Sequence, residues 1–199
     1  MHPLIYKEFE RICSERQAGG AVLEVGAIPS DKSLLTMQSL QNHVEKIGIN
    51  LTGPYEYRDF KIVKGNANAM TDFEDNRFDT VLCNAMLEHD KFFWKTIAEI
   101  RRVTKPGGLV VIGTPGYVQY HSEKIRTSLR KIPGFKRFLY RHLDLLNSAT
   151  ITFEIHGQPG DYYRFSPQTF QEVFFDGFKD VEITSVMAPP RIIGSGIKP

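Results

Sequence analysis

Residues 21–26 read AVLEVG, a short apolar run that ends at a glycine. Such a run is too short for a typical helix, and its aliphatic residues favour a buried strand. An amphipathic stretch over residues 4–17 precedes it, and the pair Gly19 and Gly20 separates the two. The stretch is therefore predicted as a buried strand that follows an N-terminal helix and turns sharply at Gly26.

Further short apolar runs alternate with helical patterns along the rest of the chain. Strands are expected at 47–51, 61–64, 78–83 and 109–113, and helices at 31–46 and 91–104. A last helix is expected at 166–176, followed by an antiparallel hairpin of residues 181–187 and 191–197. Alternating elements with nearly continuous apolar strands predict an α/β fold, with a mostly parallel sheet covered by helices on both faces.

Composition limits the classes of protein to which the chain can belong. Its 199 residues are 41% apolar and 24% charged, which is typical of one globular domain spanning 1–199. Only Cys13 and Cys83 are present, so a disulfide scaffold and a cysteine zinc site are excluded. The net charge of +2 does not indicate a nucleic-acid-binding protein. No secretory signal or membrane span is read, and a cytoplasmic location is expected.

The loop after the first strand is the expected ligand site, because α/β sheets bind ligands beyond the carboxyl ends of their strands. Here the loop reads GAIPS over residues 26–30. The pattern G-x-G-x-x-G of dinucleotide-binding folds is absent, and of its glycines only Gly26 is present. A nicotinamide or flavin dinucleotide is therefore disfavoured as the ligand.

Five short segments, taken in order, resemble the class I S-adenosylmethionine-dependent methyltransferases. They are VLEVG at 22–26, GNA at 65–67, FDTVLCN at 78–84, LEH at 87–89 and KPGGL at 105–109. The resemblance covers roughly residues 20–115 well and 160–199 loosely. It implies a Rossmann-like, seven-stranded, mostly parallel sheet with an antiparallel last strand, and S-adenosyl-L-methionine as the cofactor.

The resemblance also assigns cofactor-binding positions. Glu24, Gly26 and Ala27 fall in the family's first motif, and Asn50 and Leu51 lie where an acid usually binds the ribose hydroxyls. Asn66 and Ala67 fall where the adenine is read, and Asn84 and Ala85 close the fourth strand near the sulfonium. Asn50 and Asn66 depart from the family, because acids are usual at both positions.

Histidines are the candidates for removing a proton from the methyl acceptor. The resemblance places His89 at the mouth of the site, and His156 is a second catalytic candidate. His121, Tyr163 and Arg164 are candidates for binding the acceptor. No metal site is expected, because Ala85 stands where some relatives have the first glutamate of a Glu-x-x-Glu-His metal motif.

Residues 116–165 are expected to form a helical insertion after the fifth strand, acting as a lid or acceptor-binding segment. Seven basic residues lie within 121–142: Lys124, Arg126, Arg130, Lys131, Lys136, Arg137 and Arg141. Such a cluster favours an anionic acceptor or peripheral contact with an anionic surface, although a solvated basic face explains it equally well.

These observations predict a methyltransferase acting on a small-molecule, glycan or lipid-linked acceptor, with no nucleic-acid partner. Two alternatives stay open. One is a non-catalytic binding or scaffolding protein on the same fold, favoured by the altered first loop. The other is a short-chain NAD(P)-dependent reductase, suggested by the Tyr-x-x-x-Lys spacing of Tyr120 and Lys124. The sequence indicates neither the acceptor, nor the atom methylated, nor the oligomeric state.

Overall fold

A computed structural model of the protein describes residues 1–41, 45–117, 160–187 and 190–199. These residues belong to one compact unit, formed by 1–118 and 158–199. Most of the expected insertion 116–165 lies outside the described residues, as do the seven basic residues of 121–142. Within the described parts, no helix is long and apolar enough to cross a membrane.

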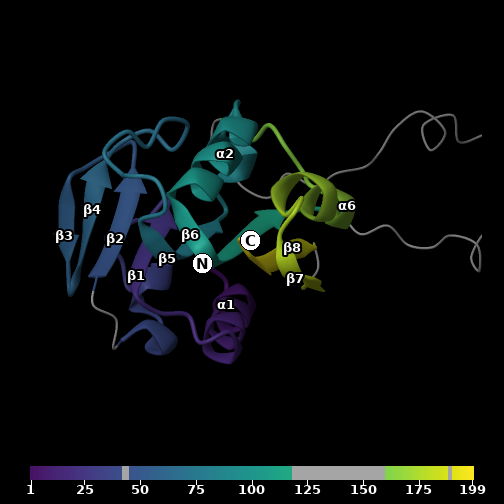
Figure 1. The fold of residues 1–199 in the computed structure, drawn as a ribbon, viewed down its shortest axis with the longest axis horizontal. Coiled ribbons are helices and arrows are strands. Elements are labelled where there is room, and N and C mark those ends of the chain that lie inside the picture. Colours follow the sequence, from purple (N-terminus) through teal and green to yellow (C-terminus); the bar gives the residue numbers. More distant parts are fainter. Residues whose placement is uncertain (42–44, 118–159, 188–189) are drawn as a thin grey trace, which may run out of the picture. The chain divides into compact units, whose positions relative to one another are not determined.

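An eight-stranded sheet forms the centre of this unit (Figure 1). The strands are β1 Ala21–Val25, β2 Glu45–Asn50, β3 Tyr55–Tyr57, β4 Phe60–Lys64, β5 Phe78–Asn84, β6 Thr104–Pro115, β7 Lys179–Val186 and β8 Arg191–Ile197. Their order is β3-β4-β2-β1-β5-β6-β8-β7. The five adjacent strands β4, β2, β1, β5 and β6 are parallel to one another. Strand β8 runs antiparallel to both of its neighbours, β6 and β7. The predicted fold class and closing hairpin are confirmed.

Two layers of helices and turns cover the two faces of the sheet. On one face lie α1 (Pro3–Glu15) and the 3-10 turns η1 (Leu34–Thr36) and η2 (Gln38–Leu40), packed on Val22, Leu82 and Val111. On the other lie α2 (Phe93–Val103), α6 (Pro167–Thr169) and the π-helical turn η4 (Phe170–Phe174). A short turn, η3 (Leu87–His89), connects β5 toward α2. Successive side chains of a central strand point to opposite faces of the sheet, and both faces are covered. The central strands are therefore hydrophobic along their whole length.

The helix expected over residues 31–46 is wrong. The chain forms η1 and η2 there instead, and β2 already begins at Glu45. Met37 between the two turns has extended dihedrals, φ −58° and ψ 145°, which end the first turn. The side chains of Leu34, Leu35 and Met37 are nevertheless all buried against the sheet.

The sheet has one strand more than the seven expected. The additional strand, β3, pairs antiparallel with β4 at the edge of the sheet. The fifth predicted strand is also longer, because Lys105-Pro106-Gly107-Gly108 lies within β6. A register shift between Phe78 and Thr80 on the neighbouring β5 accommodates this segment.

Candidate cofactor pocket

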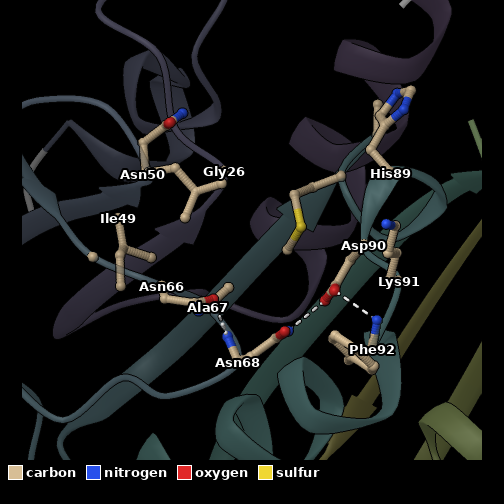
Figure 2. Close-up of a pocket in the computed structure, with 14 residues that line it drawn as sticks. Gly26, Ile49, Asn50, Asn66, Ala67, Asn68, His89, Asp90, Lys91 and Phe92 are labelled. Atoms are coloured by element: carbon tan, nitrogen blue, oxygen red, sulfur yellow. Dashed lines mark hydrogen bonds between the residues drawn. The ribbon is translucent and has the colours of Figure 1, made fainter. Parts of the chain in front are cut away.

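A cavity of about 410 Å³ lies at the carboxyl ends of β1, β2, β4 and β5. Connections from β1 and β5 lead to opposite halves of the sheet, so this is the switch point at which α/β sheets bind ligands. The residues that line the cavity are Gly26, Ile49, Asn50, Leu51, Gly65, Asn66, Ala67, Asn68, Ala85, Met86, His89, Asp90, Lys91 and Phe92 (Figure 2).

Gly26 forms the floor of the cavity at the end of β1. Its φ of 84° lies in the left-handed region, and its backbone N–H donates to the Ile49 carbonyl at 2.9 Å. A Cβ at this position would lie 2.9 Å from Cγ of Met86. A glycine is therefore needed both for the turn and for the space above it.

Asn50 lines the cavity with its amide already engaged at the rim. Its Nδ2 donates to the Ala27 carbonyl at 2.8 Å, and its Oδ1 accepts from the backbone N–H of Thr52 at 3.1 Å. The side chain thus ties the first loop to the end of β2. Ala27 is itself fully buried and does not line the cavity, in contrast to Leu51, which does and is 69% exposed.

A chain of hydrogen bonds links the loop after β4 to the start of α2 (Figure 2). Asn66 Oδ1 accepts from the Asn68 backbone N–H at 2.9 Å, and Asn68 Nδ2 donates to Asp90 Oδ2 at 2.6 Å. The hydroxyl of Thr96 also donates to Asp90 Oδ2 at 2.7 Å. Asp90 Oδ1 accepts from the Phe92 N–H at 2.9 Å. This network joins the loop that carries Asn66 and Ala67 to the segment just before α2.

Glu24 points away from the cavity. Its buried carboxylate accepts hydrogen bonds from the Ser33 hydroxyl and from the backbone N–H groups of Leu34 and Leu35. Burial raises the pKa of Glu24 to about 6, against the lowering effect of these hydrogen bonds. The residue therefore holds the first loop onto η1, rather than lying beside a ligand.

His89 lines the cavity and stands next to a buried ion pair. Its Nε2 lies 3.9 Å from Oε1 of Glu88, which in turn lies 3.6 Å from Nη1 of Arg191. Glu88 has no exposed surface, and neither of its carboxylate oxygens has a hydrogen-bond partner in the described parts of the chain. Burial raises the pKa of Glu88.

Other predicted site residues lie outside the cavity lining. Tyr163 packs against the aromatic ring of Phe93 and donates its hydroxyl to the Lys91 carbonyl at 3.1 Å. The guanidinium of Arg164 pairs with the carboxylate of Asp161, and this hydrogen-bonded ion pair raises the pKa of Arg164. Asn84 lies against Gly113 at the ends of β5 and β6, whereas Ala85 does line the cavity. His121 and His156 lie outside the described residues.

Several lining residues were not anticipated from the sequence: Ile49, Gly65, Asn68, Met86, Asp90, Lys91 and Phe92. Asn68 follows the predicted Asn66 at a spacing of two, and Asp90 precedes a helix as a capping residue would. Those signals mark turns and caps in general, so they do not single out a pocket. Among the described residues, no three His, Cys, Asp or Glu side chains are grouped as metal ligands.

Comparisons with known proteins agree with this geometry. The sequence model of a family described as a methyltransferase domain matches residues 29–112. That match starts within the first loop and ends within β6. A search of curated proteins found no match.

Solved structures share the fold at low sequence identity. A S-adenosylmethionine-dependent methyltransferase from Archaeoglobus fulgidus is 15% identical, with a TM-score of 0.63 over 98% of this chain and 93% of that one. The 1,6-didemethyltoxoflavin-N1-methyltransferase of Burkholderia thailandensis, solved with its acceptor and S-adenosylhomocysteine, is 14% identical, with a TM-score of 0.62 over 97% and 77%. Phosphoethanolamine N-methyltransferase 2 of Haemonchus contortus is 14% identical, with a TM-score of 0.61 over 97% of this chain but 52% of the enzyme.

Proposed function

We propose that this chain, a class I methyltransferase by its fold and its matched domain, transfers a methyl group from S-adenosyl-L-methionine to an acceptor molecule. The observation that carries the proposal is the cavity at the switch point of the sheet, whose lining residues apart from Gly26 all lie within the segment that the family model matches. The acceptor is proposed to be a small molecule, a glycan or a lipid-linked compound.

The residues of the cavity fit this cofactor. Its volume of about 410 Å³ lies within the range of small-molecule sites. Ile49, Ala67 and Phe92 offer apolar surface to an adenine ring, and the amide of Asn66 offers hydrogen bonds to its edge. Gly26 leaves room for close approach of the ligand to the backbone. Asn50 stands in place of the usual acid, and the N–H of its Nδ2 that does not bind Ala27 is proposed to donate to a ribose hydroxyl.

The cofactor, when bound, supplies a methyl group attached to a positively charged sulfur. The residues of the chain therefore have two tasks, which are to align the acceptor and to receive its proton. His89 is proposed as the proton acceptor, because it is the histidine that lines the cavity among the described residues. The carboxylate of Glu88 lies beside the His89 imidazole, which is the group that would gain the proton.

A thermal-shift experiment tests the choice of cofactor. S-adenosylhomocysteine is expected to raise the melting temperature, because a ligand that binds only the folded state stabilises it. NAD and NADP are expected to leave it unchanged. A shift with NADP alone would favour the short-chain reductase, and no shift with any of the three would favour a non-catalytic protein on this fold.

A further inference from the structure

Three large aromatic side chains are exposed next to the cavity. Phe92, Trp94 and Tyr162 are 47%, 50% and 48% exposed, and we call them the aromatic rim. Phe92 also lines the cavity, and its ring centroid lies 5.7 Å from that of Trp94. Because about half of each side chain is exposed, the three together present roughly 300 Å² of aromatic surface to solvent. A patch of that size lies at the lower end of the largest patches on typical monomers, which are often binding sites.

Two lysines accompany the aromatic rim. The Nζ of Lys91 lies 5.5 Å from the ring centroid of Tyr162, and the Nζ of Lys95 lies 5.1 Å from that of Phe92. Both lysines are exposed. Of the acids nearby, Asp161 pairs with Arg164, whereas Asp90 accepts three hydrogen bonds from neutral groups and keeps its negative charge, so that the two lysines outweigh it by one charge. The surface therefore combines aromatic rings with positive charge.

This surface is separate from the face of α2 that packs on the sheet. Ile97, Ile100 and Val103 form the buried face of the helix, whereas Trp94 and Lys95 lie outside it. Core packing therefore does not account for an exposed tryptophan beside an exposed phenylalanine. Tryptophan and tyrosine favour the boundary between water and lipid, and lysine is attracted to anionic headgroups.

We propose that the aromatic rim with Lys91 and Lys95 docks this protein on an anionic lipid surface. The rings enter the headgroup region, while the two ammonium groups pair with lipid phosphates. Because Lys91 and Phe92 also line the cavity, the docked protein presents its cavity mouth to the membrane. Access of a membrane-borne acceptor to the cavity rests on the proposed function, whereas the docking itself does not.

The fluorescence of Trp94 tests the proposal directly, because Trp94 is the single tryptophan of the chain and is exposed. Vesicles of phosphatidylcholine mixed with phosphatidylglycerol are expected to shift its fluorescence to shorter wavelength and protect it from acrylamide. Vesicles of phosphatidylcholine alone are expected to do so much less, and added salt is expected to reverse the effect. An unchanged spectrum at low salt, or a Trp94 already shielded from acrylamide without lipid, overturns the proposal.

Matched variants separate this surface from the basic segment 121–142. The pair Lys91→Gln and Lys95→Gln is expected to weaken vesicle binding roughly 30-fold in a sedimentation assay. The control pair Lys61→Gln and Lys64→Gln removes the same charge from exposed positions on β4 and is expected to bind as the parent does. Equal binding by all three proteins assigns the membrane contact elsewhere and overturns the proposal.

A second pair of variants tests the rings. Trp94→Ser is expected to reduce sedimentation with vesicles, whereas Leu4→Ser, at an apolar position on α1 that is 49% exposed, is expected to have no effect. Equal sedimentation of the two variants would count against the docking surface. The thermal shift with S-adenosylhomocysteine is measured on the same samples. A protein that shows the shift without binding vesicles refutes the docking alone, and one that binds vesicles without the shift refutes the methyltransferase function alone.

Discussion

Glu24 and Gly26 lie two residues apart at the end of β1, and their side chains have different surroundings. The carboxylate of Glu24 is buried behind the first loop, where it accepts hydrogen bonds from Ser33, Leu34 and Leu35. Gly26 faces the cavity below Met86. One residue therefore holds the loop in place, and the other leaves room for the ligand.

Glu24 is expected to make folding stability depend on pH. Its pKa is about 6 in the folded protein and 4.5 ordinarily, so between these values the folded state binds more protons than the unfolded state. The unfolding free energy therefore falls as pH rises through this window, by about 2 kcal/mol from this residue. Glu24→Gln is expected to remove that part of the slope in urea titrations. The exposed-site variant Glu56→Gln is the control, and an unaltered slope in Glu24→Gln would contradict the assignment.

Gly26→Leu is expected to abolish binding of S-adenosylhomocysteine. The new side chain would occupy the floor of the cavity and adopt a backbone conformation that side chains rarely tolerate. Circular dichroism is expected to show an intact sheet, while calorimetric titration shows no heat of binding. A folded variant with the parent's affinity would place the ligand elsewhere.

At the scale of elements, the cavity depends on how the loop after β4 is joined to α2. Asn68 is the connecting residue, because its amide donates to both Asp90 and Thr96. Asp90 in turn accepts a hydrogen bond from the N–H of Phe92, the residue just before α2. The two walls of the cavity are thus held by side chains rather than by strand pairing.

Asn68→Ala is expected to lower both stability and ligand affinity. Loss of the two hydrogen bonds costs about 1–3 kcal/mol in unfolding free energy and frees one wall of the cavity. Asn68→Asp is expected to cost more at neutral pH, because it places a second carboxylate against Asp90. Urea unfolding and titration with S-adenosylhomocysteine measure both effects. Parent-like affinity in both variants would show that the network does not shape the cavity.

At the scale of the whole described unit, the two cysteines report on the two faces of the sheet. Cys13 belongs to the core under α1, and Cys83 belongs to the core under α2. Burial raises the pKa of Cys13 to about 12 and that of Cys83 well above its usual value. Neither thiol is therefore reactive while the protein is folded.

Thiol labelling is expected to be slow and to slow further with ligand. If both sites react only through global unfolding, S-adenosylhomocysteine at 100 times its Kd slows both roughly 100-fold. The variants Cys13→Ala and Cys83→Ala allow each thiol to be followed alone by mass spectrometry. Protection of Cys83 without protection of Cys13 would show instead that α1 detaches independently of the ligand site.

The sequence alone predicted the sheet and the order of its elements, apart from the edge strand β3 and the segment 31–46. Continuous apolar strands between amphipathic helices are a local signal, and they predicted the parallel sheet and its antiparallel end. The position of the cavity followed from the same rule, since ligands bind where parallel strands end. Gly26, Asn50, Asn66 and Ala67 were accordingly expected there, and all four line the cavity.

Only the tertiary structure decided which side chains face the cavity and which support it. Glu24 binds the hydroxyl of Ser33, and Asn68 is hydrogen-bonded directly to Asp90, 22 residues further along the chain. The segment expected as a helix over 31–46 formed two short turns, because Glu24 binds the N–H groups at its start and Met37 is extended. These outcomes depend on contacts between residues distant in the chain, and local sequence patterns carry no information about such contacts.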